Sequence, residues 1–210
     1  MTVGAGAYRV EALGAAVEVD SPLSGAHQHR NLALAIAAAV ELAERHGFPI
    51  TPNAIATGVR ETWWPARLER FQADGVEWVL DVAHNPAGAW ALRAGLCDIL
   101  SDARRHTLIF SCLRDKPIVE LAQILFPLFD DVILTPIHSA RAAALEDLLA
   151  AGKATGTDAL AAESVQHALE LARQRTEGGV VVIAGSFYLV GEARTLVISD
   201  KLFKIKELIG

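Results

Sequence analysis

The stretch Val-Glu-Trp-Val-Leu-Asp-Val-Ala-His-Asn-Pro-Ala-Gly-Ala-Trp, residues 76–90, decides the fold class of this sequence. Its first part, residues 76–82, is mostly apolar and fits a buried strand. Asn85 and Pro86 follow in the order of an N-cap and the first position of a helix. We therefore predict a strand, a short turn and a helix over residues 86–100.

Asp81 and His84 fall at the carboxyl end of this predicted strand. Open α/β sheets bind their ligands at that edge, so both residues are candidates for a functional site. An aspartate at a strand end also forms turns, and an isolated histidine is often structural. These fifteen residues by themselves leave a functional site and a structural turn equally open.

Strands and helices alternate along the chain after residue 66. We expect strands over residues 67–71, 76–82, 106–112, 132–135 and 180–184, a short edge strand over 153–155, and helices over 86–100, 117–125, 142–149, 163–175 and 187–196. This alternation predicts an α/β fold with a Rossmann-like, mainly parallel, doubly wound sheet. It also places Ser186, at the start of the last helix, on the same sheet edge as Asp81 and His84. We cannot assign a role to the tail, residues 200–210.

The first 64 residues have a different pattern. They predict a hairpin over residues 8–12 and 16–19, then helices over 31–46 and 52–62. A hairpin alone is barely stable, so we expect residues 1–64 to be a fragment of a larger domain and residues 65–210 to be one α/β domain. The apolar face of the 31–46 helix should then stay exposed or be covered by another copy of the chain.

Composition narrows the class of protein. The 210 residues carry a net charge of −6 without an obvious basic face, which argues against nucleic acid as a partner. No apolar run is long enough to span a bilayer and no signal peptide is visible, so we expect a cytoplasmic protein without membrane contact. Cys97 and Cys112 form no metal motif and are interpreted as two buried free thiols. Neither the dinucleotide glycine pattern nor a Walker phosphate loop occurs.

Four stretches carry a resemblance to a known family: Gly-Ala-His-Gln-His-Arg-Asn at 25–31, Trp-Pro-Ala-Arg at 64–67, Asp-Val-Ala-His-Asn-Pro at 81–86 and Gly-Ser-Phe-Tyr-Leu at 185–189. In this order and spacing they resemble the C-terminal half of folylpolyglutamate synthase / dihydrofolate synthase, of the Mur ligase superfamily. The resemblance covers nearly the whole chain. It implies that residues 1–64 are the end of a central ATPase domain and that residues 65–210 are the C-terminal glutamate-ligase domain.

The resemblance implies an ATP-dependent ligase that joins L-glutamate to a folate or dihydropteroate carboxylate through an acyl phosphate. In the family, ATP binds between the two domains. Asn31 is then expected on the adenine side, with Arg67 and Asp81 holding the nucleotide from the C-terminal domain and with His84 and Ser186 near the incoming glutamate. An arginine suits phosphate oxygens, and a serine at a helix N-terminus suits a carboxylate. No residue of this chain is assigned as a catalytic group or as a metal ligand.

Two departures from the family pattern matter. Ala66 stands where the family usually has glycine, so a positive φ there is expected to be unfavourable. The family's phosphate-binding loop, its modified metal-binding lysine, its Mg²⁺ ligands and its folate-binding elements precede the part that this chain resembles. The chain alone is therefore expected to be inactive.

Two other functions remain open from the sequence. One is a different Mur-type ligase that joins another amino acid, although no charged recognition motif for such an amino acid is visible. The other is a non-enzymatic Rossmann-like module that binds a small molecule or a partner. The sequence also leaves open whether the full protein makes dihydrofolate, extends glutamate tails or does both.

Overall fold

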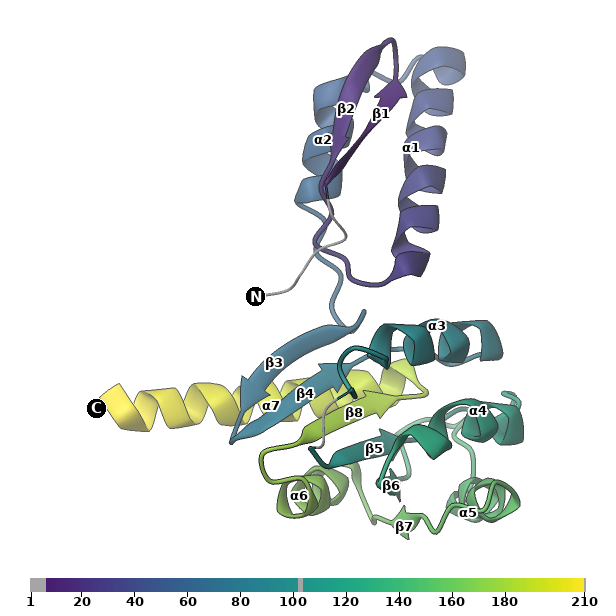
Figure 1. Ribbon diagram of the computed structural model, residues 1–210, viewed down its shortest axis with the longest axis vertical. Helices are drawn as coiled ribbons and strands as arrows, with labels where there is room; N and C mark the ends of the chain where they lie inside the picture. The colour runs from purple at the N-terminus through teal and green to yellow at the C-terminus, as the bar shows by residue number, and fades with distance from the viewer. Residues whose placement is uncertain (1–6, 102–103, 210) are drawn as a thin grey trace. The chain divides into compact units, whose positions relative to one another are not determined.

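The computed structural model describes residues 7–101 and 104–209, with side chains described up to residue 198. The chain forms two compact units, Met1–Arg67 and Leu68–Gly210 (Figure 1). The predicted boundary falls three residues earlier, between residues 64 and 65. Arg67 therefore belongs to the first unit, whereas the sequence assigned it to the C-terminal domain.

The first unit begins with the predicted antiparallel hairpin of β1 (Tyr8–Ala12) and β2 (Ala15–Val19). Leu13 and Gly14 connect the strands with φ values of 52° and 73°. Two consecutive positive φ values are typical of a type I′ turn, whose twist matches that of the hairpin strands. Glycine adopts this conformation readily, whereas Leu13 does so at a cost of about 1–2 kcal/mol.

Two helices complete the first unit. Helix α1 (Ala26–His46) begins five residues before the predicted start at residue 31 and ends at Gly47, whose φ of 69° is left-handed. Helix α2 (Pro52–Arg60) begins as predicted, because the Thr51 side chain accepts the Ala54 N–H at 3.1 Å. The core of the unit joins hairpin and helices through seven buried residues: Ala12, Val17, Val19, Leu32, Ile36, Ile55 and Val59.

Apolar surface remains exposed on this unit, as predicted. Leu34 on α1 is 62% exposed, and Phe48 just beyond the helix is 54% exposed. An open groove of about 380 Å³ runs between the two helices, lined mainly by Leu32, Ala35, Ile36, Ala39, Ile50, Ala54, Ile55 and Val59. The helix face itself is partly covered by the hairpin and by α2. Self-association through this surface stays a prediction.

The second unit contains a six-stranded sheet in the order β3-β4-β8-β5-β6-β7. All neighbouring strands are parallel except β3 and β4, which form an antiparallel pair at one edge. The mainly parallel sheet is thus confirmed. The strands are β3 (Glu69–Ala73), β4 (Val76–Leu80), β5 (His106–Phe110), β6 (Asp131–Leu134), β7 (Leu160–Ala161) and β8 (Val180–Ala184).

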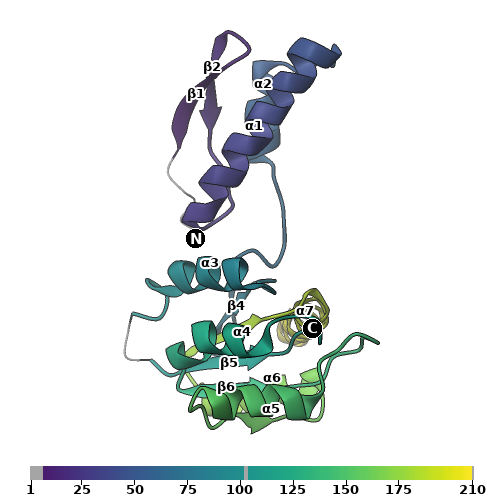
Figure 2. The same ribbon diagram turned by 90° about the vertical axis from the view of Figure 1, so that its right-hand side faces the viewer.

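Helices cover both faces of this sheet. Figure 2 shows α3 (Pro86–Leu96), α4 (Ile118–Leu125) and α5 (Leu145–Ala154) on the face toward the viewer, with α6 (Val165–Arg175) and α7 (Phe187–Ile209) behind it. The main core lies under α3, α4 and α5, where Leu92, Leu121 and Leu148 pack on alternate strand residues such as Phe110 and Val182. This alternation follows from the two-residue period of a strand.

Some predicted bounds are wrong, for local reasons. The strand predicted over residues 153–155 does not exist, because α5 continues to Ala154; the edge strand is β7. Helix α5 starts at Leu145, later than predicted, because Ala142 pairs with Leu113 in an isolated bridge. Helix α3 stops at Leu96 instead of residue 100, and α7 runs to Ile209 through most of the tail that the sequence left unassigned.

The backbone just before the sheet is unusual. Ala66 has a φ of 58° and Leu68 a φ of 47°. Ala66 therefore takes the left-handed conformation despite its Cβ, although such a conformation costs a non-glycine residue about 1–2 kcal/mol. Both side chains are buried, and that of Leu68 packs on Gly95 of α3. These packing contacts offset part of the backbone strain.

Candidate functional site

The candidate residues of the second unit gather at the carboxyl edge of the sheet. Asp81 directly follows β4, and Ser186 follows β8 after one residue. Because β4 and β8 are parallel neighbours with Leu80 level with Ile183, these strand ends lie side by side. The Asp81 N–H donates to the Ile183 carbonyl at 3.1 Å. The predicted shared edge is confirmed, whereas the ligands assigned to these residues stay predictions.

Asp81 is buried, with 5% of its surface exposed, and its carboxylate holds backbone groups. Oδ2 accepts the Leu68 N–H at 2.9 Å, and Oδ1 accepts the Ala83 N–H at 2.8 Å. Asp81 therefore has a structural role of its own, which the sequence did not distinguish from ligand binding.

His84 is fixed in orientation by two contacts. Its Nδ1 lies 2.8 Å from the Val82 carbonyl oxygen, and because a carbonyl only accepts, Nδ1 carries the hydrogen. Its ring lies 5.1 Å from that of Phe187, the first residue of α7. In the neutral imidazole, Nε2 is then left as an acceptor, and in the protonated ring it becomes a donor. The ring can thus serve an amine or a carboxylate.

Ser186 lies at the N-terminus of α7. Its hydroxyl oxygen accepts the Tyr188 N–H at 3.1 Å, and its own O–H remains a donor. Gly185 precedes it with a φ of 110°, and a Cβ on Gly185 would lie 2.5 Å from the Ser111 carbonyl oxygen. Only glycine fits this turn, which brings Ser186 to the helix start. The unsatisfied N–H groups there favour an anion.

The loop after β5 contributes charge to the same edge. Lys116 lies 3.4 Å from the Asp115 carboxylate, which also pairs with Arg141 at 2.8 Å. The Arg141 hydrogen bond and the two cations hold the pKa of Asp115 below its ordinary value, against a smaller effect of burial. Lys116 is thus part of an ion-paired loop.

The candidate residues of the first unit share one cavity. Asn31 and Arg67 both line a space of about 420 Å³, together with Leu23, Gln28, Leu32, Ala35, Thr62 and Trp64. The Arg67 guanidinium lies 5.9 Å from the ring centroid of Trp64, within cation–π range. The cavity combines apolar walls with an amide and a cation, a common composition for a ligand site.

The sequence did not single out Gln28 at this cavity. Gln28 is buried, with 4% exposed, and its Oε1 accepts from Asn31 Nδ2 at 3.0 Å. The signal was present in the 25–31 stretch, since residues three apart on a helix face each other. Gln28 and Asn31 have this spacing, but from the sequence a role was assigned to Asn31 alone.

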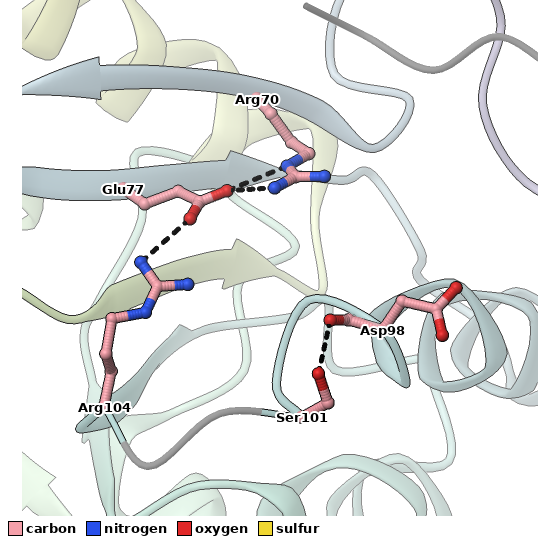
Figure 3. A network of polar contacts seen from close by, with 5 residues as sticks. All are labelled: Arg70, Glu77, Asp98, Ser101 and Arg104. Atoms are coloured by element: carbon pink, nitrogen blue, oxygen red, sulfur yellow. Dashed lines mark hydrogen bonds and ion pairs between the residues drawn. The ribbon is translucent and has the colours of Figure 1, made fainter.

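A second buried carboxylate lies away from the candidate site. Glu77 pairs with Val180, the first residue of β8, and so lies at the amino end of these parallel strands, away from the carboxyl edge that holds the candidate site. Figure 3 shows Glu77 between Arg70 and Arg104, at 2.8 Å from Arg70 Nε and 3.0 Å from Arg104 Nη1. Burial raises the pKa of Glu77, but the hydrogen bonds and charges of the two arginines outweigh it, so the pKa lies below its ordinary value.

Other ligand types find little support in the described part of the chain. Among those residues, no group of three His, Cys, Asp or Glu side chains is placed to hold a metal ion. No helix there is long and apolar enough to cross a membrane. The prediction of two buried thiols is wrong for Cys97, which is exposed at the end of α3, and right for Cys112. Burial raises the pKa of Cys112 to about 12, which disfavours the nucleophilic thiolate form.

A mainly parallel sheet with helices on both faces and polar groups at its carboxyl edge defines the second unit as a Rossmann-like domain. Residues 66–187 match the family described as Mur ligase, glutamate ligase domain. The chain belongs to the Mur ligase family, and the resemblance stated from its four motifs is confirmed.

Relatives within this family are folate enzymes. The chain is 33% identical over 184 residues to the folylpolyglutamate synthase of Lacticaseibacillus casei, covering 88% of this chain and 41% of that protein. It is 32% identical, with a TM-score of 0.75, to a Mycobacterium tuberculosis folylpolyglutamate synthase complexed with ADP and AMPPCP, covering 91% of this chain and 45% of that one.

A third similar protein is a bifunctional folylpolyglutamate synthase/dihydrofolate synthase with Mn, AMPPNP and L-glutamate bound. It is 25% identical, with a TM-score of 0.64, covering 78% of this chain and 37% of that one. The chain thus spans about two fifths of the length of the curated relatives it matches.

Proposed function

We propose that this chain is the C-terminal part of an ATP-dependent ligase that joins L-glutamate to a folate or dihydropteroate carboxylate. The observation that carries the proposal is that Asp81, His84 and Ser186 share one sheet edge within the region that matches the glutamate ligase domain. The proposal includes the assignment of residues 1–64 to a central ATPase domain and a cytoplasmic location.

In this proposal, Asn31 and Arg67 contact the nucleotide. Their common cavity is large enough for a nucleobase, with apolar walls for the flat ring and an amide for its polar edge. The Arg67 guanidinium supplies the charge for phosphate oxygens. Asp81 is assigned to the ribose hydroxyls, from which a carboxylate at the carboxyl end of a strand can accept.

We assign His84 and Ser186 to the incoming glutamate. The reaction forms a C–N bond between its amine and an acyl phosphate, and phosphate leaves with the electrons of the broken C–O bond. The amine attacks only after losing a proton, and Nε2 of a neutral His84 can accept a hydrogen from it. The hydroxyl of Ser186 and the free N–H groups at the start of α7 suit a carboxylate.

The remaining chemistry requires groups outside these 210 residues. Mg²⁺ would shield the triphosphate and stabilise the charge that develops during phosphoryl transfer. The described residues contain no cluster that fits such a metal, so we expect its ligands and the phosphate-binding loop from preceding elements of the full-length protein.

Steady-state kinetics of the full-length protein test the proposal. We expect ADP formation that requires both L-glutamate and a folate or dihydropteroate. His84→Ala should lower kcat/KM for glutamate at least about tenfold and change the KM for ATP much less, since the lost group contacts the amine and accepts its proton. ADP formation that depends on another amino acid, or that is unaffected by glutamate, would contradict the assignment. Asp98→Ala, an exposed change on the same unit, is the control.

A further inference from the structure

A chain of hydrogen bonds on the first turn of α1 links His27, Gln28 and Asn31. The Nε2 of Gln28 lies 2.9 Å from Nε2 of His27, and its Oε1 accepts from Asn31 Nδ2 at 3.0 Å. When the His27 ring carries its hydrogen on Nδ1, its Nε2 accepts from Gln28. The Gln28 oxygen then faces Asn31, and because an oxygen only accepts, Asn31 must donate to it from Nδ2.

The orientation of Asn31 determines what the cavity recognises. One Nδ2 hydrogen is used by Gln28, so Oδ1 and the second Nδ2 hydrogen remain for a ligand. An acceptor beside a donor complements the adenine edge, where the exocyclic amine donates and a ring nitrogen accepts. Guanine presents a carbonyl oxygen in place of that amine and would meet Oδ1 with like polarity.

We propose that Gln28, held by His27, is a positioning residue that makes Asn31 select adenine nucleotides over guanine nucleotides. The inference rests on the proposed function, in which this cavity holds the nucleobase. Gln28 itself is buried and acts through Asn31, which is exposed along the cavity.

A fixed amide matters because an unrestrained Asn side chain can rotate by half a turn and exchange its donor and acceptor. A rotated amide would present its donor to the guanine carbonyl oxygen and its acceptor would no longer face the adenine amine only, so selectivity would fall. A well-oriented bidentate amide contact discriminates against the wrong base by about 5- to 150-fold in affinity. Apolar walls such as Leu32 and Ala35 contact either base alike and cannot supply this preference.

Isothermal titration of the full-length protein with ADP and with GDP measures the preference directly. We expect wild type to bind ADP at least about fivefold more tightly than GDP. Gln28→Leu, similar in size and apolar, should reduce that ratio by about fivefold or more. Gln28→Glu still offers an oxygen to Asn31 Nδ2 and should retain the wild-type ratio. His27→Leu removes the outer end of the chain at a half-buried position and should lower the ratio in the same direction.

Gln123→Leu, the same change at an exposed position of α4, is the matched control and should leave the ratio unchanged. Thermal unfolding establishes that each variant is folded before titration. An equal loss of ADP and GDP affinity in Gln28→Leu and His27→Leu would show a purely structural role and overturn the inference. A wild-type ratio near one would overturn it as well. If the protein prefers ADP over GDP as expected but forms no ADP in response to glutamate, the proposed function is overturned and the role of Gln28 is not.

Discussion

The carboxylate of Asp81 accepts the backbone N–H of Leu68 at 2.9 Å and thereby ties the start of β3 to the end of β4. Leu68 has a φ of 47°, a conformation that a leucine rarely adopts without support. The same carboxylate accepts the Ala83 N–H at 2.8 Å in the turn that leads to His84. One buried side chain therefore stabilises both turns of the candidate site.

Asp81→Ala should destabilise the fold as well as weaken ATP binding. It leaves two backbone N–H groups without their acceptor, at about 1–3 kcal/mol each, so we expect a loss of about 2–6 kcal/mol in the free energy of unfolding. Asp81→Asn keeps one acceptor oxygen and should lose about half as much. Urea unfolding measures both variants, with Asp98→Ala, an exposed change on the same unit, as the control. A loss below 1 kcal/mol would show that these two bonds contribute little.

Several parts of this fold could be predicted because local signals agree. The strand Val180–Ala184 is correct at both ends, since five consecutive apolar residues lie between polar or glycine-rich turns. The start of α2 was predicted correctly because Thr51 followed by Pro52 is the usual order of an N-cap residue and the first helical position. Parallel neighbours follow from the alternation of strands and helices.

Other features depend on contacts between distant residues and could not be predicted. The helix predicted from residue 142 begins later, because Ala142 is bound to Leu113 across the loop after β5. The cavity lined by Asn31 and Arg67 brings together residues far apart in the sequence. Ala66, just before Arg67, has a left-handed φ, which the sequence marked as unfavourable. The structural bonds of Asp81 likewise appear only when β3 is placed beside β4.

Gly185→Ala should be strongly destabilising. The new Cβ would lie 2.5 Å from both the Ser111 carbonyl oxygen and Phe110 Cε2, at a φ of 110° that alanine does not adopt. We expect a loss of at least about 3 kcal/mol, because the new Cβ would overlap a backbone oxygen and an aromatic ring and would also be held at a strained φ.

Gly191→Ala is the matched control on α7, since nothing lies within 4 Å of its Cβ position. There we expect a gain of about 0.5–1 kcal/mol from helix propensity. Thermal or urea unfolding measures the change in the free energy of unfolding for both variants. The same glycine-to-alanine change is thereby compared at a crowded position, Gly185, and at an uncrowded one, Gly191. Similar values for both would contradict the close approach at Gly185.

The ion pairs of Glu77 predict a pH dependence of stability. Burial raises its pKa and the two arginines lower it further than burial raises it, so the folded-state pKa is depressed. Such a group stabilises the fold above its unfolded-state pKa of about 4.3. That contribution is lost as the pH falls through the folded-state value.

Glu77→Gln should therefore reduce the free energy of unfolding at pH 7 by about 1–3 kcal/mol, less than for a fully buried pair because both arginines are partly exposed. The difference from wild type should shrink between pH 5 and pH 3. Chemical unfolding across this range measures it, with Glu163→Gln as the exposed control. A constant difference at all pH values would show that the carboxylate is not held in its charged form.

The 210 residues on their own should bind Mg-ATP weakly and show no glutamate-dependent ATP hydrolysis. Arg67 offers one charge-assisted contact and Asp81 another, each worth about 1.5–3 kcal/mol. Added without loss, they reach about 3–6 kcal/mol, which corresponds to millimolar affinity or slightly better. The triphosphate also needs a cradle of backbone N–H groups, and phosphoryl transfer needs donor and acceptor held in line. Isothermal titration with Mg-ATP measures the affinity, and a micromolar dissociation constant would mean that these residues already contain a complete nucleotide site.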